Sequence, residues 1–558
     1  MTDATRGLAL LFEPDGYVTS GPRLMGRQAA GEGFLRAAIL NRGLAPLWAY
    51  TANPASAQVF KDLVGAIDPA VKALWCPPDR LDLLAGIGLL YIPGPTLADS
   101  ARLRLRAGAA AWSLCGITHT TASHVAMDAI AELLSAPVMP WDALIATSHA
   151  VAATIKTVLE AQIAYLRWRF GSAAAPALPQ LPIIPLGVHC ADFQFTEAER
   201  NEARRAHGFG PDDIVALFVG RLSFHAKAHP HVMYRALQAA SQRTGRRVSL
   251  VLCGWFANEH STRAFADGAA KASPDVRYVH TDGRDPAQRR RSWAAADLFI
   301  SMSDNIQETF GLTPIEAMAA GLPAVVSDWD GYKETVRDGV DGFRIPTSMP
   351  APGAGEELAA GHESGRFSYD VYCGLACQTV AIDERVLVQR LADLLADDKL
   401  RRTLGASGRV RARERFDWSV VMNQYRQLWA ELERMRRTAA ANDDWRARLA
   451  AAPRAAATRL DPFRSFAAYP TKVISQDTRV GLAEGASVAA YEAWSRHPLY
   501  DYAAEVLPGA DEVERLLAGL ADGPRTIAEL AAILGIGAKR MAVAIAVLSK
   551  LGLTRPEP

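Results

Sequence analysis

Short, wholly apolar runs that alternate with helical patterns constrain the fold of this chain more than any other feature. Ile214–Val219 (IVALFV) and Val248–Cys253 (VSLVLC) are continuous apolar runs, typical of parallel strands that are covered on both faces. The same reasoning predicts further strands at Leu8–Phe12, Leu89–Ile92, Ser113–Ile117, Ala143–Thr147, Val276–His280, Leu298–Ser301 and Ala324–Ser327. Strands that alternate with helices favour right-handed βαβ units. We therefore expect two doubly wound parallel sheets in tandem, with a ligand cleft between them.

Helix ends and changes in composition along the chain predict its domain organisation. In the first domain, residues 1–190, a helix is expected at Gly31–Asn41, ended by Arg42-Gly43. A second α/β domain covers 191–437, and its last part from Val386 is helical and heavily charged. Residues 438–510 begin with an Ala/Arg-rich stretch and are interpreted as a linker or extension. Residues 511–558 hold three short amphipathic helices, which predict a small all-helical module.

Charge, cysteine content and hydropathy exclude several classes of protein. The 61 basic and 60 acidic residues nearly cancel, which argues against a surface that binds nucleic acid or anionic lipid all over. The six cysteines are scattered, and the single close pair, Cys373 and Cys377, fits neither a zinc site nor a disulfide framework. Apolar runs reach about ten residues, half of what a membrane span needs. We expect a soluble cytoplasmic protein, or one that contacts the inner face of a membrane peripherally.

The segment Ser303–Gly342 (SDNIQETFGLTPIEAMAAGLPAVVSDWDGYKETVRDGVDG) carries the most specific pattern. Glu308 and Glu316 flank a turn that enters a helix near Thr313-Pro314, where proline is well placed. The loop Phe310-Gly311-Leu312-Thr313 would offer free backbone N–H groups at the helix N-terminus, a geometry that binds diphosphate or sugar oxygens. Carboxylates on either side of such a loop suit the hydroxyls of a sugar or ribose.

This E-x7-E arrangement, with FGL between the acids and EAMAAGLPAV after them, resembles the family 4 retaining glycosyltransferases of the GT-B fold (group 1 glycosyltransferases). Other segments extend the resemblance over roughly residues 8–435: Gly26-Arg27 before a helix, GITHTTAS with His119, Leu186-Gly187-Val188, and Val219-Gly220-Arg221-Leu222 followed by Lys227. The resemblance implies two Rossmann-like domains that face a cleft, with a nucleotide-sugar donor held by the second.

The resemblance also implies residue roles, which come after it and depend on it. Glu316 would hold the ribose hydroxyls and Glu308 the hydroxyls of the donor sugar, while Arg221 and Lys227 would neutralise charge on the leaving diphosphate. His119 would sit by the donor sugar, and Gly26 would let the backbone approach the phosphates. The remaining residues expected to contact the donor are Arg27, Gly220, Phe310, Gly311, Leu312 and Thr313. Fixed cations and amide dipoles stabilise such a leaving group without a metal, so no metal and no cofactor is expected.

This sequence departs from the family pattern in three places. Arg221 and Lys227 are six apart, one residue more than usual, and Ala228 stands where a glycine is expected. Arg27 takes the place of the second glycine of a pair. Asp328-Trp329-Asp330 spells D-x-D, a metal-binding motif of another glycosyltransferase fold, and is interpreted here as a chance match.

Two surface features leave their function open. A basic cluster, Arg102, Arg104 and Arg106, precedes Trp112. It is either a surface that contacts a membrane or an ordinary helix face exposed to solvent. The three C-terminal helices resemble a winged helix-turn-helix, but 511–558 holds six acidic and six basic residues and ends too soon for a wing hairpin. Without a net charge drive toward phosphates we do not expect nucleic-acid binding, and favour docking or homo-oligomerisation.

The pattern as a whole predicts an enzyme: a retaining, metal-independent glycosyltransferase that moves a sugar from a nucleotide-sugar donor to an acceptor hydroxyl by front-face attack. Two alternatives stay open. One is another GT-B enzyme, either a nucleotide-sugar epimerase or a phosphorylase with a lysine-bound pyridoxal cofactor. The other is a regulator that binds DNA or protein through the C-terminal module. The nucleobase, the sugar and the acceptor stay open as well.

Overall fold

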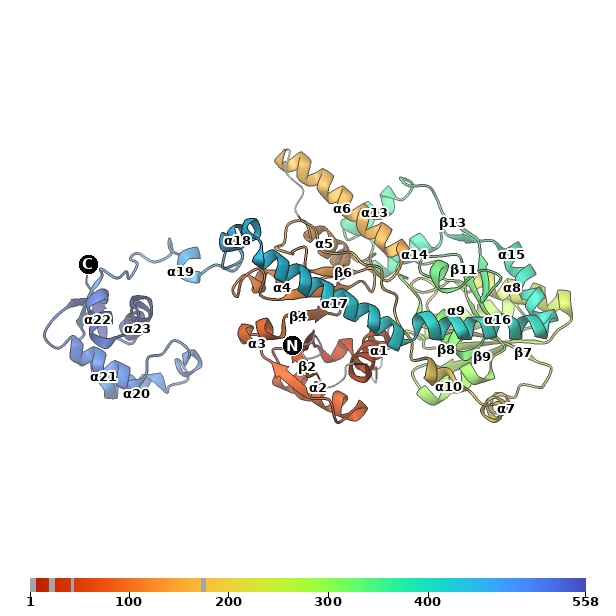
Figure 1. Cartoon of the computed structure of the whole chain (residues 1–558), viewed down its shortest axis with the longest axis horizontal. Coiled ribbons are helices and arrows are strands. Elements are labelled where there is room, and N and C mark those ends of the chain that lie inside the picture. Colours follow the sequence, from red (N-terminus) through yellow and green to blue (C-terminus); the bar gives the residue numbers. More distant parts are fainter. Residues whose placement is uncertain (1–6, 20–25, 42–44, 172–176, 558) are drawn as a thin grey trace. The chain divides into compact units, whose positions relative to one another are not determined.

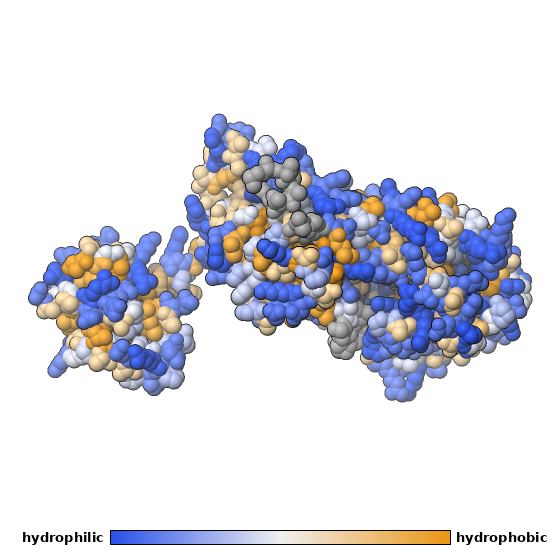
Figure 2. Space-filling view, turned by 60° about the horizontal axis from the view of Figure 1, so that its bottom comes forward, coloured by the Kyte–Doolittle hydropathy of each residue, from blue (hydrophilic) through white to orange (hydrophobic). Residues whose placement is uncertain are grey.

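The computed structural model describes residues 7–19, 26–41, 45–171 and 177–557. The chain divides into two compact units, residues 1–456 and 457–558, and each is described by itself. Figure 1 shows two layered lobes of strands and helices within the first unit. Polar residues cover most of the face of this unit that Figure 2 presents, with apolar residues in small groups between them.

The first lobe is a six-stranded parallel sheet in the order β3-β2-β1-β4-β5-β6. Its strands are β1 (Leu8–Leu11), β2 (Leu47–Tyr50), β3 (Ala73–Cys76), β4 (Leu89–Ile92), β5 (Ser113–Ile117) and β6 (Ala143–Ile145). Its helices are α1 (Gly26–Leu40), α2 (Pro54–Ile67), α3 (Leu81–Ile87), α4 (Ala98–Arg104), α5 (His124–Glu132) and α6 (His149–Phe170). The strand order reverses between β1 and β4, the kind of point at which open α/β sheets bind ligands.

The second lobe repeats this plan with the order β12-β11-β10-β7-β8-β9. Its strands are β7 (Ile214–Val219), β8 (Val248–Gly254), β9 (Arg277–Asp282), β10 (Leu298–Ser301), β11 (Ala324–Ser327) and β12 (Gly342–Ile345). Its helices are α7 (Glu197–Ala206), α8 (His231–Thr244), α9 (Glu259–Ala272), α10 (Pro286–Ala295), α11 (Leu312–Ala320), α12 (Tyr332–Thr335), α15 (Glu384–Ala396) and α16 (Asp398–Arg411). Every residue of β7 and β8 is buried, because helices cover both faces of the sheet.

The predicted doubly wound architecture is confirmed, and the predicted strands β4, β5, β7, β10 and β11 have the bounds expected from the sequence. Three strands of the two sheets, β2 (LWAY), β3 (ALWC) and β12 (GFRI), were not predicted, since four-residue segments give little periodic signal. Helix α1 begins at Gly26, five residues before the predicted start. Its predicted end at Arg42-Gly43 lies outside the described residues.

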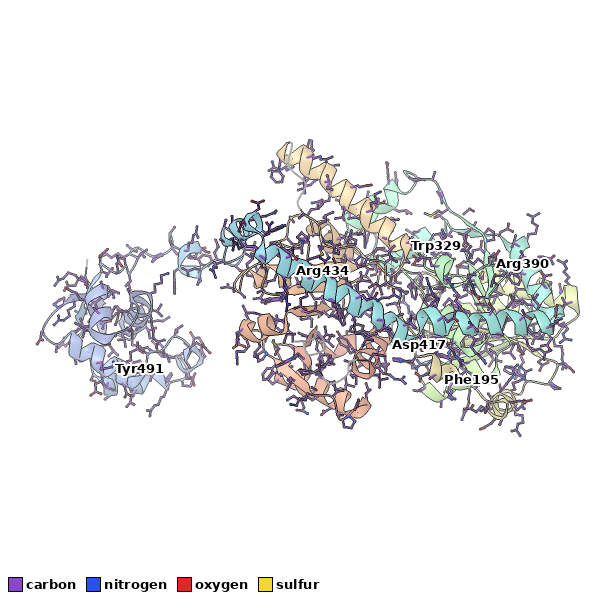
Figure 3. All side chains as sticks on the ribbon, in the orientation of Figure 1. Phe195, Trp329, Arg390, Asp417, Arg434 and Tyr491 are labelled. Atoms are coloured by element: carbon purple, nitrogen blue, oxygen red, sulfur yellow. The ribbon has the colours of Figure 1, made fainter. Side chains whose placement is uncertain are left out.

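A long helix, α17 (Trp418–Ala441), returns from the second lobe and packs on the first. Asp417 caps it, and Figure 3 labels this residue at the start of the helix. The Trp418 and Tyr425 rings pack against Phe34 of α1, at centroid distances of 6.1 and 5.3 Å. In the segment that connects the two lobes, a Cβ on Gly187 would lie 2.4 Å from the Trp418 ring, so only glycine fits there. These contacts join the two lobes behind the cleft.

The C-terminal unit contains the three predicted helices and also a small sheet. The helices are α21 (Ala510–Gly519), α22 (Ile527–Leu534) and α23 (Ala538–Lys550), preceded by α20 (Val488–Ser495). Strand β15 (Arg479–Leu482) pairs antiparallel with β16 (Arg525–Thr526) and β17 (Thr554–Pro556). The sheet was not predicted because β15 lies more than forty positions from β16 and the strands are two to four residues long.

The structure also tests the hydropathy argument. Among the described residues, no single helix is long and apolar enough to cross a bilayer. Helices α22 and α23, bent by 109° relative to each other, reach that length and apolarity only as a pair. Their apolar side chains, among them Leu530, Ile545 and Leu548, form the buried core of the C-terminal unit.

The arginine cluster of α4 is not the free basic patch that membrane contact would need. Arg104 is fully buried and forms a two-pronged ion pair with the equally buried Asp142, at 2.6 and 2.7 Å. Arg102 pairs with Asp99 and with Glu132. The Arg104 guanidinium therefore joins α4 to the loop before β6, and its charge is neutralised inside the lobe.

Candidate active site

The loop before α11 follows β10, and no side chain of the described residues caps the helix that it opens. Gly311 is the N-cap residue with φ of +79°, and no side chain caps the N-terminus of the helix. A Cβ on Gly311 would lie 2.0 Å from the Tyr332 ring, so this position requires glycine. The N–H groups of Leu312 and Thr313 therefore open the helix without a side-chain partner at the N-cap, as an anion site requires. The Phe310 side chain is buried and packs against Phe416, so only its backbone can face a ligand.

Glu308 and Lys227, which are 81 residues apart in the sequence, form an ion pair. Burial raises the pKa of Glu308, but the neighbouring Lys227 outweighs that effect and holds the pKa below its ordinary value. Burial lowers the pKa of Lys227, and Glu308 more than compensates, so the lysine pKa is raised. Both groups are thus charged at neutral pH, and the pair is neutral as a whole.

Arg221 lies beside this pair and donates to neutral oxygens. Its guanidinium contacts Ala226 O at 2.8 Å and Gln307 Oε1 at 3.0 Å. Among the described residues no carboxylate pairs with it within salt-bridge distance. Gln307 immediately precedes Glu308, so Arg221 is held next to the Glu308 end of the α11 loop. Its positive charge is therefore available to an anion in the cleft.

Glu316 lies one turn into α11, as predicted. Burial raises its pKa to about 7, against the opposing charges of Arg289 and Lys227. The carboxyl group thus titrates near neutrality in the absence of a ligand. Sequence reasoning missed Arg289 of α10, because nothing distinguishes it from its neighbours in the run QRRR.

His119 lies at the carboxyl end of β5 and reaches the second lobe. Its backbone oxygen accepts a hydrogen bond from Thr309 Oγ1 at 3.3 Å, next to Glu308. Burial, with a smaller contribution from Arg27, lowers the pKa of His119 to about 4. The imidazole is therefore neutral at physiological pH, and can exchange hydrogen bonds with a sugar but cannot act as a cationic acid.

Gly26 and Arg27 begin α1 in the first lobe. A Cβ on Gly26 would meet no atom of the described residues within 4 Å, so as far as these residues go the backbone is open to an approaching group there. Arg27 was predicted to contact the donor. In the structure its guanidinium forms an exposed ion pair with Asp15 at 2.5 Å, so Asp15 partly neutralises its charge. The roles of both residues stay predictions.

A second contact between the lobes surrounds Asp330. This residue has a φ of +44°, a left-handed conformation that is uncommon outside glycine, and its Oδ1 accepts from Ser148 Oγ at 3.3 Å. Burial, and to a lesser extent Glu308, raise its pKa to about 8. Nearby, His149 donates its backbone N–H to Glu334 at 2.5 Å. None of these contacts was predicted, since no local pattern links α6 to α12.

The two aspartates of the D-x-D sequence have different partners. Asp328 lies 3.4 Å from Arg344, whereas Asp330 faces Ser148 of the other lobe. Between them, Trp329 donates its indole N–H to Asn305 O at 3.0 Å; Figure 3 labels this tryptophan. Among the described residues no group of three or more His, Cys, Asp or Glu side chains is arranged as a metal site.

Three glycines bring the carboxyl ends of β7, β8 and β9 into direct contact, and two of them escaped sequence analysis. A Cβ on Gly254 would lie 1.9 Å from the oxygen of the predicted Gly220, and one on Gly283 3.0 Å from Gly254 Cα. Gly220 itself has a φ of +152°.

Comparison with known proteins agrees with this geometry. Residues 199–354 match the family model described as glycosyl transferases group 1. The D-inositol 3-phosphate glycosyltransferase of Actinosynnema mirum is 34% identical over 220 residues, 36% of this chain and 50% of that protein. The phosphatidyl-myo-inositol mannosyltransferase of Mycobacterium tuberculosis is 27% identical over 264 residues, 47% of this chain and 56% of that protein.

Among solved structures, a crystal structure of Anabaena Alr3699/HepE in complex with UDP overlaps 76% of this chain and 100% of that chain, with 16% identity and a TM-score of 0.49. The chain spans about half the length of the curated relatives it matches. The match to the family model covers the loop with Arg221 and Lys227 and the whole Glu308–Glu316 block. The second lobe of this chain therefore resembles the group 1 glycosyl transferases over residues 199–354, within an architecture of two doubly wound lobes.

Proposed function

We propose that this protein is a retaining glycosyltransferase that moves a sugar from a nucleotide-sugar donor to an acceptor hydroxyl, without a metal or a cofactor. One observation carries the proposal: Arg221, the Lys227–Glu308 pair and the uncapped N-terminus of α11 converge at the face where the two lobes meet. The names of the relatives, an inositol phosphate glycosyltransferase and a mannosyltransferase, support it. We also propose a cytoplasmic location.

The charges favour front-face transfer. As the bond from the anomeric carbon to the diphosphate oxygen breaks, negative charge develops on that oxygen, and Arg221 with the α11 N–H groups stabilises it. The acceptor oxygen then bonds to the anomeric carbon on the same side, and its proton passes to the departing diphosphate. Glu308 is neutralised by Lys227, which suits binding of sugar hydroxyls better than attack on carbon.

A thermal-shift screen of the full chain against UDP-, GDP- and ADP-sugars tests the donor. A ligand that binds only the folded state stabilises it by about 2.7 kcal/mol at a hundred times its Kd, a shift of several degrees. We expect one nucleotide class to raise the unfolding midpoint in this way. If none does at millimolar concentration, the nucleotide-sugar assignment is wrong, and the alternative of a nucleotide-sugar epimerase is excluded as well.

Peripheral membrane contact stays part of the proposal, but its site moves from α4 to the end of α6. Residues 161–171, here called the α6 tip, include Tyr165, Trp168 and Phe170, which are 50%, 77% and 70% exposed. Arg167 and Arg169 lie between these aromatics, and the tip contains no acid. In Figure 1 the last turns of α6 extend beyond the body of the first lobe. Exposed aromatics interleaved with arginines fit the interface of an anionic bilayer.

Flotation with vesicles checks this surface. We expect the full chain to float with phosphatidylcholine vesicles that contain anionic phosphatidylglycerol, and the Trp168→Ala/Phe170→Ala double variant to bind at least about tenfold more weakly, because two aromatics leave the interface. Trp494→Ala, an exposed tryptophan of the C-terminal unit, is the matched control. Equal binding of the double variant, or binding that ignores the anionic lipid, would contradict this assignment.

A further inference from the structure

An insertion follows β12 of the second lobe. Residues 347–382, here called the latch, leave and return through a two-stranded ribbon in which β13 (Thr347–Ser348) pairs with β14 (Ala381–Ile382). Between these strands lie α13 (Glu356–Glu363) and α14 (Tyr369–Cys377). The match to the family model stops inside the latch, at residue 354. The latch is therefore a closed excursion from the second lobe.

The latch packs on the loop that carries Arg221 and Lys227. A Cβ on Gly374 of α14 would lie 2.9 Å from Cβ of His225, so α14 touches the loop without an intervening side chain. Cys377 donates from Sγ to Phe224 O at 3.6 Å. The position of α14 is thus tied to the loop that presents the leaving-group cations.

The latch also reaches across to the first lobe. The His362 ring of α13 stacks on His124, the first residue of α5, at 3.8 Å, and on Tyr372 of α14 at 4.6 Å. Beside this stack, Tyr369 Oη lies 3.4 Å from Thr120 Oγ1. Figure 1 shows α13 and α14 on the side where the two lobes meet. The latch therefore closes one side of the cleft.

Tyr369 occupies a particular place in this arrangement. Its partner Thr120 follows His119 in the first lobe. Arg221, which belongs to the second lobe as Tyr369 does, acts on the phenol electrostatically. Burial raises the pKa of Tyr369, against the effects of Thr120 and Arg221, so the phenol stays protonated. Its contact with Thr120 is long for a hydroxyl–hydroxyl hydrogen bond, and a ligand hydroxyl can replace it at little cost.

The strand order indicates which substrate the latch faces. Arg289, whose charge acts on Glu316 of α11, belongs to α10, which packs along β7, β8 and β9, and the proposed nucleotide site lies on that side of α11. The latch arises from β12, at the opposite edge. The side that the latch closes is therefore the side away from the nucleotide, where an acceptor would enter.

We infer that the latch forms the acceptor side of the site and that Tyr369 donates a hydrogen bond to a hydroxyl of a polyol acceptor, a sugar or cyclitol. The inference rests on the proposed function. Neutral partners, the phenol of Tyr369 and the hydroxyl of Thr120, suit hydroxyl groups, and Arg221 stays directed at the leaving diphosphate.

The test uses the full chain and the nucleotide sugar found by the thermal-shift screen. Release of nucleoside diphosphate is measured with glucose, mannose, myo-inositol and their monophosphates as probe acceptors. We expect at least one probe to accelerate release by the wild type. Tyr369→Phe should raise the KM for that probe about fivefold to tenfold, the loss of one neutral hydrogen bond, with the donor Kd unchanged.

Tyr372→Phe is the matched control, since Tyr372 belongs to the same helix and stacks on His362 without an assigned role for its hydroxyl. An unchanged KM in Tyr369→Phe, or an equal rise in Tyr372→Phe, overturns the role of Tyr369. A wild type that binds its donor but responds to no probe overturns the polyol assignment. A wild type that binds no nucleotide sugar refutes the proposed function instead.

Discussion

Replacing Arg221 with alanine is expected to lower kcat by about a hundredfold to a thousandfold while the donor Kd changes less than about threefold. Removal of one preorganised donor to a developing anion has effects of this size. Among the described residues Arg221 donates to the neutral oxygens Ala226 O and Gln307 Oε1 and to no carboxylate, so its charge is not neutralised before the leaving group forms. The measurement is steady-state release of nucleoside diphosphate together with donor binding by calorimetry.

Arg263→Ala is the control for this variant, since Arg263 lies on the outer surface of α9 in an exposed pair with Glu259. It should keep the full rate. A normal kcat in Arg221→Ala would contradict a role at the leaving group, and a loss confined to donor affinity would assign Arg221 to ground-state binding.

Lys227 is a poorer target for the same question. Its ammonium neutralises Glu308, whose side chain is only 10% exposed. Removing one partner of such a pair leaves an uncompensated charge and costs about 3–5 kcal/mol of stability. A loss of activity in Lys227→Ala could therefore come from lost stability or from a lost role in the reaction. Among the described residues no buried carboxylate depends on Arg221 for its counter-charge, so Arg221→Ala separates the two effects.

Glu316→Gln is expected to weaken donor binding about tenfold to a hundredfold at pH 8, because a carboxylate accepts ribose hydroxyls more strongly than an amide does. The wild type should also show a pH dependence that the variant lacks. With a pKa of about 7 in the free protein, Glu316 is mostly protonated at pH 6 and mostly charged at pH 8. Donor affinity should therefore fall as the pH drops below 7, by up to about tenfold per unit.

The affinity is measured by calorimetry between pH 6 and 8 with the intact nucleotide sugar, which lacks the terminal phosphate monoester that titrates near 6. Glu356→Gln, at the exposed start of α13, serves as the control. A flat profile in the wild type, or the same profile in Glu316→Gln, would contradict the ribose role.

Local sequence patterns predicted the second lobe well because its signals are local. Continuous apolar runs define β7 and β8, and the turn at Gly311 before Thr313-Pro314 defines the start of α11. The candidate residues around that loop could be named for the same reason. Each depends on a motif shorter than about forty residues.

What the sequence could not predict are contacts between distant segments. Lys227 and Glu308 were proposed for separate tasks, and only the fold shows that they neutralise each other. Arg289, Asp330 and Tyr369 reach the cleft from loops and helices whose local pattern resembles ordinary surface. The prediction of a basic cluster at Arg102, Arg104 and Arg106 failed because a distant partner was invisible in the sequence. Arg104 is buried and paired with Asp142, 38 positions away.

The central claim is that the crevice between Arg221, Glu308 and Glu316 holds the donor. A crystal structure of the full chain with the nucleotide sugar selected by the screen tests it most directly. We predict the diphosphate at the N–H groups of Leu312 and Thr313 beside Arg221, with the ribose hydroxyls on Glu316. A nucleotide bound elsewhere, for example in the cavity of about 460 Å³ between the first sheet and α17, would contradict it.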